Sequence, residues 1–237
     1  MNIRISISIL AFLAFASFSC NEETKKIINY NSNDGNTDVT TMATPNGTKL
    51  RPAQSGPVRS ALGEPKVDLN AYQLEITGLV DSSYSLSWED ILKLPAVSSD
   101  TILMYCVEGW EVWGNWKGIL IKPLLDKARI QSQGEYVHFG CLDGYATSLP
   151  IDYLAKYNTI LAYEVNGQPL KAENGYPLRL VAFGKYGYKW AKWINKVEVI
   201  DESQLGYWEK RGYSDEANVP LDRRKYYEGE NVKPLEY

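Results

Sequence analysis

Short apolar runs of strand length recur along the chain from residue 72 onward. The segment Tyr72–Thr77 alternates apolar and polar side chains and is followed by Gly78, which is typical of a half-buried strand. Similar apolar runs predict further strands over residues 101–106, 135–141, 159–165, 178–183 and 193–200. Asn166-Gly167, directly after the third of these runs, is a dipeptide favoured in tight hairpin turns. The central part of the chain is therefore expected to be rich in sheet.

Three short helices are predicted between these strands. Ser87 and Asp90 have the spacing of a capping box, and Pro95 ends the helix that they begin. The other two helices cover residues 119–130, with Pro123 in the first turn, and residues 150–157. Short strands and helices without a regular βαβ repeat predict an α+β fold. We assign residues 65–212 to one such domain.

The N-terminus has the pattern of a secretory signal. Arg4 precedes an apolar run over residues 5–18, which is short for a membrane span. The end of the run, just before Cys20, resembles a bacterial lipoprotein signal, with residues 1–19 removed and a lipid on Cys20. An ordinary cleaved signal peptide or a single membrane anchor is the alternative. Each of these predicts an extracytoplasmic chain, in the periplasm or cell envelope, and the lipoprotein signal predicts a membrane anchor.

Two segments outside the predicted domain are poor in apolar periodicity. Residues 20–64 comprise the candidate lipidated cysteine and a stretch rich in Asn, Gly and Pro, which we interpret as a flexible tether. Residues 213–237 form a charged, turn-rich tail that we expect to lie along the surface. No chemistry is predicted for the tether.

Composition changes this picture in two respects. The chain has 25 Lys and Arg against 29 Asp and Glu, a net charge of −4, so it has no surplus of positive charge for a polyanion. We therefore expect no nucleic-acid binding. All seven tryptophans lie between Trp88 and Trp208, which places both the core and the functional site in the middle of the chain.

Cys106 is the first candidate for chemistry. It follows an apolar strand and begins the segment CVEGW, so its thiol would lie at a strand end, where a cleft can form. Thiolates bind soft metals. Two other interpretations are open: Cys106 is a small core residue, or it forms a disulfide with Cys141. The only histidine, His138, lies on an alternating strand and is expected to be structural. One histidine without a C-x-x-C pair makes a zinc site held by protein ligands alone unfavourable.

The segment 174–193 is the second candidate. It places Arg179 on an apolar strand, followed by a glycine-containing loop that carries Lys185, Lys189 and Lys192. A guanidinium group on a strand beside a cationic loop suits a phosphorylated ligand. A solvated basic loop after an edge strand is the alternative.

Together these segments resemble the sulfite oxidase-type molybdopterin oxidoreductases. Within that family the chain is most similar to the catalytic subunit of periplasmic methionine sulfoxide reductase systems. The resemblance covers residues 65–212 and is carried, in the family's order, by CVEGW at 106–110, WKGILIKPLL at 116–125, DGY at 143–145, SLP at 148–150, LAYEVNGQPL at 161–170, NGYPLRL at 174–180 and KYGYKWAKW at 185–193. It implies a mixed-sheet α+β fold that binds a molybdenum–molybdopterin cofactor.

The resemblance also implies roles for individual residues. Cys106 would be the thiolate ligand of molybdenum. The residues that match positions holding the pterin and its phosphate end are Asn174, Arg179, Trp190, Ala191 and Lys192, and Cys141 falls where the family has a threonine contact to the cofactor. Glu108 and Trp110, just beyond the metal ligand, would shape the substrate mouth. The asparagine- and tyrosine-rich stretch that supplies further contacts in the reductases is missing. So is the arginine-rich motif of true sulfite oxidases, which argues against an anionic sulfite pocket.

The implied activity is oxygen-atom transfer, in the direction that reduces a sulfoxide-like substrate. Because no second redox centre is evident, an external electron donor such as a membrane cytochrome is expected. Two alternatives belong to other classes: an interaction domain that kept the fold and lost the cofactor, and a glycan-binding lipoprotein domain whose exposed aromatic rings stack on sugars.

Overall fold

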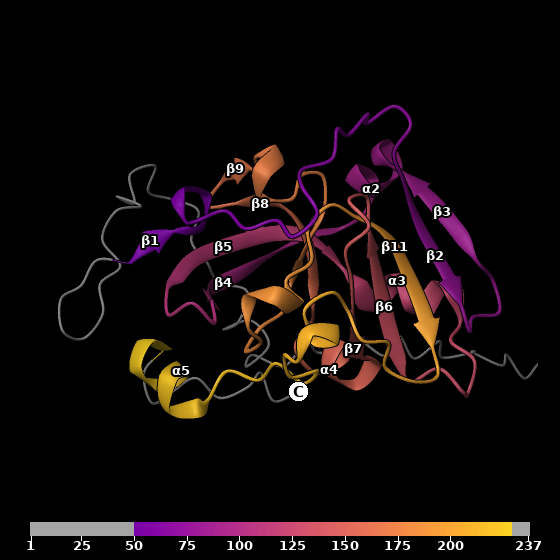
Figure 1. Ribbon diagram of the computed structural model, residues 1–237. Coiled ribbons are helices and arrows are strands. Elements are labelled where there is room, and N and C mark those ends of the chain that lie inside the picture. Colours follow the sequence, from indigo (N-terminus) through magenta and orange to yellow (C-terminus); the bar gives the residue numbers. More distant parts are fainter. Residues whose placement is uncertain (1–49, 229–237) are drawn as a thin grey trace, which may run out of the picture. The chain divides into compact units, whose positions relative to one another are not determined.

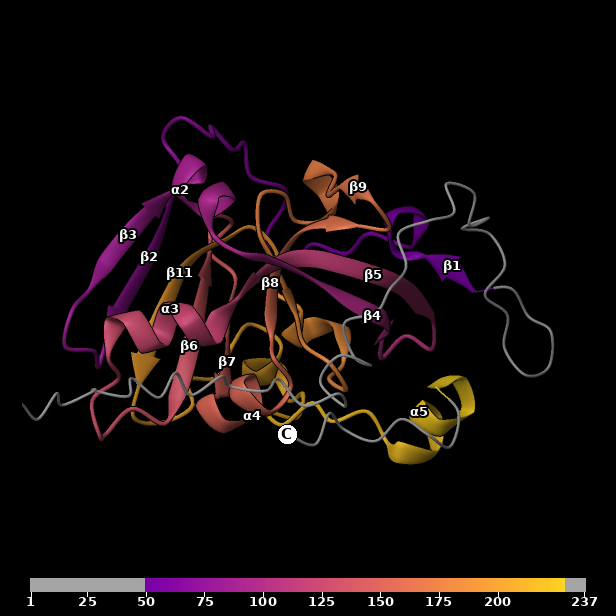
Figure 2. The same cartoon turned by 180° about the vertical axis from the view of Figure 1, so that it is seen from behind.

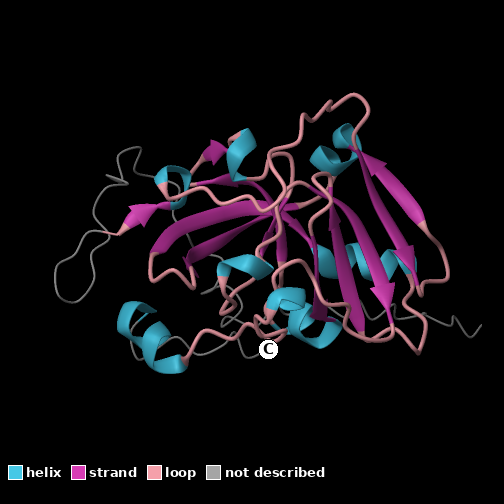
Figure 3. Cartoon of the chain, viewed as in Figure 1, coloured by secondary structure: helices cyan, strands magenta, loops and turns pink. Residues whose placement is uncertain are grey.

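Two β-sheets form the framework of the part of the chain that this computed structural model describes, residues 50–228 (Figures 1 and 3). The six-stranded sheet follows the path β1 (Arg51–Pro52), β5 (Glu111–Leu120), β8 (Ile160–Val165) and β10 (Arg179–Val181), with β4 (Ala96–Tyr105) paired to β5 and β9 (Gln168–Pro169) paired to β8. The five-stranded sheet has the order β3 (Tyr84–Ser87), β2 (Gln73–Gly78), β11 (Ile194–Ile200), β6 (Tyr136–Cys141) and β7 (Ala146–Pro150). Each sheet combines antiparallel pairs with one parallel pair, β1 with β5 and β2 with β11.

The helices are short and lie outside the sheets. They are α2 (Trp88–Lys93), α3 (Ile121–Ala128), α4 (Ile151–Lys156) and α5 (Leu221–Glu228), together with 3-10 turns at Ala53–Ser55, Ala172–Asn174, Gly187–Lys189 and Glu209–Arg211. Figure 2 shows α3 against one face of the five-stranded sheet. Mixed sheets with few helices confirm the predicted α+β fold.

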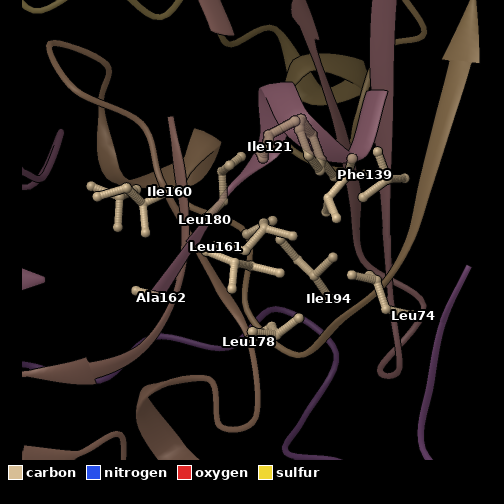
Figure 4. Close-up of a cluster of buried hydrophobic side chains, with 14 of the residues drawn as sticks. Leu74, Ile121, Phe139, Ile160, Leu161, Ala162, Leu178, Leu180 and Ile194 are labelled. Atoms are coloured by element: carbon tan, nitrogen blue, oxygen red, sulfur yellow. The ribbon is translucent and has the colours of Figure 1, made fainter. Parts of the chain in front are cut away.

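Side chains from both sheets form the main hydrophobic core. Leu161 and Leu180 from β8 and β10 lie near Ile194 of β11 and Phe139 of β6, and each of these four is completely buried (Figure 4). The chain between β10 and β11 joins the sheets through backbone hydrogen bonds from Leu180 N to Ala191 O at 2.9 Å and from Ile194 N to Leu178 O at 3.0 Å. The loop 182–193 is thereby held by both sheets, and it supplies much of the site described below.

The local sequence signals are confirmed. Ser87 accepts a hydrogen bond from Asp90 N while the Asp90 side chain accepts one from Ser87 N, which is the predicted capping box of α2. Asn166 and Gly167 have φ values of 52° and 72°, as a two-residue hairpin turn requires, and they join β8 to β9. The remaining predicted strands and helices are present with shifts at their ends, because end residues depend on tertiary contacts.

Strand β5 was not predicted, although it pairs with β1, β4 and β8. Its sequence, EVWGNWKGIL, lacks alternation because residues on both faces are buried. Gly118 belongs to the strand for a steric reason. A Cβ there would lie 2.0 Å from the carbonyl oxygen of Leu161 on β8. Glycine inside an apolar run gives a weak strand signal, so only the tertiary contacts identify this strand.

The structure places part of the predicted tether inside the domain. Pro52 of β1 pairs with Trp113 of β5, and Ala53 is buried in the main core. The reason is long-range pairing with β5, which the local composition of residues 50–61 does not reveal. The predicted C-terminal tail is also partly buried at Ala217 and Val219. The signal segment and Cys20 lie outside the described residues. Within residues 50–228, no helix combines the length and apolar character needed to cross a bilayer.

Candidate active site

A cavity of about 460 Å³ is lined by segments that are far apart in the sequence. They lie within residues 53–61, 104–116, 143–145, 173–193 and 207–213. Most of the residues that the sequence analysis singled out for the site within the described range line this one cavity: Cys106, Glu108, Trp110, Asn174, Arg179, Trp190, Ala191 and Lys192. Cys141 is not among the lining residues.

Cys106 lies at the turn between β4 and β5. Its backbone N–H donates to Trp110 O at 2.8 Å, and Gly109 closes the turn with a φ of +91°, which a residue with a side chain rarely adopts. The thiol is partly buried and unpaired. Burial raises its pKa, while the backbone N–H groups of Glu108 and Val107 act to lower it. These N–H groups favour the thiolate form, whereas the burial of the sulfur and the charge of Glu108 disfavour it.

Glu108 is held in place by two neighbours in the cavity wall. Its carboxylate accepts hydrogen bonds from Arg59 Nε at 3.1 Å and from Trp110 Nε1 at 2.8 Å. Arg59 Nη2 lies 2.9 Å from the same carboxylate. Hydrogen bonds from Arg59 and Trp110 lower the pKa of Glu108, so this side chain is ionised at neutral pH.

Arg179 lies at another part of the same cavity and has unusual surroundings. Its side chain donates to Asn174 O at 2.9 Å and to Met104 Sδ at 3.0 Å, and the guanidinium carbon is 5.6 Å from the Trp116 ring centre. Met104 is two residues before Cys106 on β4, so the arginine lies close to the strand that bears the candidate metal ligand. Burial lowers the pKa of Arg179 to about 10, and it has no carboxylate partner among the described residues.

The lysines of the predicted cationic loop have different surroundings. Lys192 lines the cavity and donates to Glu173 O at 2.9 Å, and burial followed by the charge of Arg179 lowers its pKa to about 8. Lys185 donates to Asn218 Oδ1 at 2.8 Å. Lys189 is fully buried in ion pairs. The prediction of three lysines around the ligand is therefore wrong for Lys185 and Lys189, because neither lines the cavity and both bond to residues of the C-terminal segment.

Several buried polar atoms around the cavity have no hydrogen-bond partner within the described part of the chain. They are Nε of Arg179, Oδ1 of Asn174 and Nε1 of Trp116. Buried polar groups are nearly always hydrogen-bonded, so unpaired donors and an unpaired acceptor on one cavity indicate a ligand that supplies both kinds of group. Molybdopterin carries N–H donors on its pterin and anionic oxygens on its phosphate. The residues present therefore fit this cofactor.

Two predictions about the other candidate residues can be compared with the structure. Cys106 and Cys141 are both unpaired, so the alternative of a disulfide between them does not hold here. Cys141 is buried at the end of β6, and burial raises the pKa of its thiol. His138 Nδ1 is 3.0 Å from Ser148 Oγ and borders a separate cavity of about 230 Å³, in agreement with a structural role. Among the described residues, no three His, Cys, Asp or Glu side chains gather as metal ligands.

Some lining residues were not predicted. Arg59 came from the segment interpreted as a tether, and nothing in its local sequence indicated the pairing with Glu108. Asp143 and Tyr145 also line the cavity, and the DGY motif that contains them was a signal that could have identified them. Four aromatic residues line another part of the cavity: Tyr188, Tyr207, Trp208 and Tyr213. Ring contacts join Tyr207 to Trp208, Trp208 to Tyr213 and Tyr213 to Tyr188.

Comparison with known proteins agrees with this site. Residues 61–208 match the family model of the oxidoreductase molybdopterin binding domain. The uncharacterized oxidoreductase YuiH of Bacillus subtilis is 35% identical over 147 residues, covering 62% of this chain and 74% of that protein. The putative protein-methionine-sulfoxide reductase subunit YedZ1 of Azospira oryzae is 34% identical over 63% of this chain and 56% of its own length.

Two further matches extend the comparison. The protein-methionine-sulfoxide reductase catalytic subunit MsrP of Gluconobacter oxydans is 32% identical over 65% of this chain and 57% of its own length. The match thus spans little more than half of both reductase proteins. The crystal structure of the sulfane dehydrogenase SoxCD from Paracoccus pantotrophus superposes with a TM-score of 0.59 at 19% identity, over 84% of this chain and 57% of that chain. That likeness supports the fold. The chain therefore belongs to the oxidoreductase molybdopterin binding domain family, and it is a molybdopterin-dependent oxidoreductase with an α+β sulfite oxidase-type fold.

Proposed function

We propose that this oxidoreductase reduces a sulfoxide-type substrate by oxygen-atom transfer at a molybdenum centre ligated by Cys106. The observation that carries the proposal is that one cavity is lined by both Cys106 and Arg179, a buried arginine that has no carboxylate partner among the described residues. The overall reaction converts a sulfoxide, two protons and two electrons into a thioether and water. When bound, the molybdenum cofactor supplies the two-electron oxygen-transfer chemistry.

The chain's own residues would position and tune the cofactor. Cys106 would supply the thiolate, and the N–H groups of Val107 and Glu108 would stabilise charge on its sulfur. Arg179 and Lys192 would bind the phosphate end, Asn174 would accept from the pterin, and the backbone around Ala191 would be positioned by its hydrogen bond to Leu180. Cys141 remains a predicted contact that would act from behind the cavity wall, because it does not line the cavity.

The two alternative classes receive less support. A sugar-binding platform needs exposed tryptophans, yet four of the seven are buried and the other three, Trp88, Trp110 and Trp208, are only partly exposed. A domain that had lost its cofactor would be expected to fill the cavity or pair the buried arginine. Arg179 instead has no carboxylate partner among residues 50–224, and the cavity borders it.

The sequence also supports inferences about the electron donor of the enzyme and about its location in the cell. We infer an extracytoplasmic enzyme that a lipid on Cys20 anchors to the membrane and that an external donor, such as a membrane cytochrome, reduces. The support is the lipoprotein-like signal at residues 1–19 and the lack of a second redox motif. The names of the reductase relatives support a sulfoxide substrate for those proteins, and we extend that class to this chain as part of the proposal.

The Cys106→Ser variant tests the proposed function. We expect loss of sulfoxide reduction with a preserved far-ultraviolet circular dichroism spectrum, because a partly buried thiol at a turn contributes little to the core. Molybdenum content, pterin fluorescence and reduction of a sulfoxide by an artificial donor would be measured on wild type and variant made in a host that synthesises molybdopterin. Full activity in Cys106→Ser, or a wild-type protein without molybdenum from such a host, would contradict the proposal.

A further inference from the structure

Two arginines line the cavity, and they differ in whether a carboxylate of the described residues neutralises their charge. Arg179 is buried, has an unpartnered Nε and has no carboxylate partner among the described residues. Arg59 has every guanidinium nitrogen engaged: Nε and Nη2 on the Glu108 carboxylate and Nη1 on Val58 O at 3.2 Å. One arginine is therefore available to an anionic ligand, whereas the other is already neutralised.

The neutralised arginine lies at the turn that bears Cys106. Glu108 follows Cys106 by two residues in the β4–β5 turn, Arg59 is paired with it, and all three residues line the cavity. Arg179 and Lys192 lie in another part of the cavity, where Arg179 has no ion pair with a carboxylate of the described residues. The cavity thus combines a part that holds this buried arginine with a part near Cys106 whose lining charges, Arg59 and Glu108, offset each other in an ion pair.

The pair is built from parts of the chain that only the fold brings together. Arg59 belongs to the segment that follows β1, and Glu108 belongs to the β4–β5 turn. Trp110 holds the same carboxylate through Nε1 at 2.8 Å, which limits the positions that Glu108 can adopt. Val58 and Val107, next to the two charged residues, also line the cavity and are exposed apolar groups. The wall near Cys106 therefore presents apolar side chains and a closed ion pair.

We propose that the Arg59–Glu108 pair determines substrate specificity by keeping the Cys106 part of the cavity free of net charge, so that uncharged sulfoxides are accepted and anionic ones are disfavoured. This inference rests on the proposed function. Glu108 is the determining residue, because it removes Arg59 as a binding group for an anion. A water-exposed cation would attract anionic substrates, and a carboxylate without its arginine would repel them.

The proposal is tested with two single variants, which should shift the substrate preference in opposite directions, and with the double variant, in which the two shifts should cancel. Holoenzyme kcat/KM is measured for two sulfoxides of similar size, one uncharged and one bearing a carboxylate. Glu108→Gln keeps the side-chain shape and removes the charge that neutralises Arg59, so the ratio of anionic to neutral kcat/KM is expected to rise about fivefold, because the arginine then attracts the anionic substrate. Arg59→Gln should lower the ratio, and Arg59→Gln/Glu108→Gln should return it toward wild type.

Controls separate electrostatics from structural damage. Asp81→Asn removes a carboxylate from another exposed ion pair, with Arg129, that does not line the cavity, and it should leave the ratio unchanged. The effects of Glu108→Gln and Arg59→Gln should both weaken at high ionic strength. The proposal would be overturned if a variant changed kcat/KM equally for both substrates. It would also be overturned if the ratio of anionic to neutral kcat/KM moved in the same direction in the two single variants.

A second readout needs no turnover. In the full-length chain made without cofactor, with folding checked by circular dichroism, Cys106 is alkylated with iodoacetate or iodoacetamide and its peptide is quantified by mass spectrometry. The ratio of Cys106 alkylation by the anionic iodoacetate to alkylation by the neutral iodoacetamide should rise about fivefold in Glu108→Gln. The same ratio should fall in Arg59→Gln. If the wild-type holoenzyme reduces neither sulfoxide, the proposed function fails, and the alkylation ratios still decide the charge inference. Unchanged ratios in both variants would refute that inference.

Discussion

The buried charge of Arg179, which has no carboxylate partner among the described residues, leads to a prediction with two effects of opposite sign. Arg179→Met keeps an unbranched side chain of similar length and removes the positive charge. We expect the cofactor-free chain to become no less stable, and to gain as much as about 1–2 kcal/mol, while the affinity for the cofactor falls about 100-fold. A residue kept for folding would instead lose stability when replaced.

The magnitudes follow from the contacts of Arg179. Its side chain makes hydrogen bonds to Asn174 O and Met104 Sδ and a cation–π contact with Trp116, which together contribute on the order of 2–3 kcal/mol. Against this stands the cost of burying a charge without a carboxylate, several kcal/mol in proteins. Replacing the charge with a thioether removes both terms, so the net change is small or favourable. Two charge-assisted bonds to a phosphate are worth about 3 kcal/mol in affinity, hence the 100-fold loss.

Two measurements on the same proteins check this reasoning. Urea unfolding of wild type and Arg179→Met, both made in a host without molybdopterin, gives the difference in unfolding free energy. Molybdenum and pterin content after production in a competent host gives cofactor retention. Arg179→Lys is the matched variant, since it keeps the charge and should retain more cofactor than Arg179→Met. A variant that unfolds more easily by about 2 kcal/mol, or one with full molybdenum occupancy, would refute the argument.

Two further predictions concern buried lysines. Lys189 has no exposed surface, and its Nζ is 2.6 Å from the equally buried Glu209 and 2.9 Å from Asp215. Lys189→Met should therefore lower the unfolding free energy by about 3–5 kcal/mol in urea titrations, with partial recovery in Lys189→Met/Glu209→Gln; a loss below about 1 kcal/mol would contradict this. Lys192 has its pKa lowered to about 8 from 10.5, so the unfolded chain binds more protons between these values and stability should rise with pH there in the cofactor-free chain. Lys192→Gln should reduce that rise, measured by urea unfolding at several pH values, and an unaltered slope would count against it.

Much of the local structure could be predicted from neighbouring residues. The capping box at Ser87 and Asp90 and the turn at Asn166-Gly167 depend on hydrogen bonds and dihedral angles within a few residues, so their sequence signals are confirmed. Strand β5 was missed because it is buried on both faces and contains Gly118. A glycine is required there because the backbone of β8 leaves no room for a side chain. The apolar residues of this segment alone do not distinguish a strand buried on both faces from a turn-rich loop.

The sequence by itself determined the family, through motifs around Cys106 and Arg179 whose residue types suit a metal ligand and a phosphate contact. Only the tertiary structure decided which charges remain available at the site. Lys189 turns inward because Glu209 compensates its charge, whereas Arg179 is buried without a carboxylate, and Arg59 enters the cavity wall from a segment with no periodic pattern. The physical reason is that desolvation and ion pairing depend on long-range contacts. Spacing along the chain does not encode them.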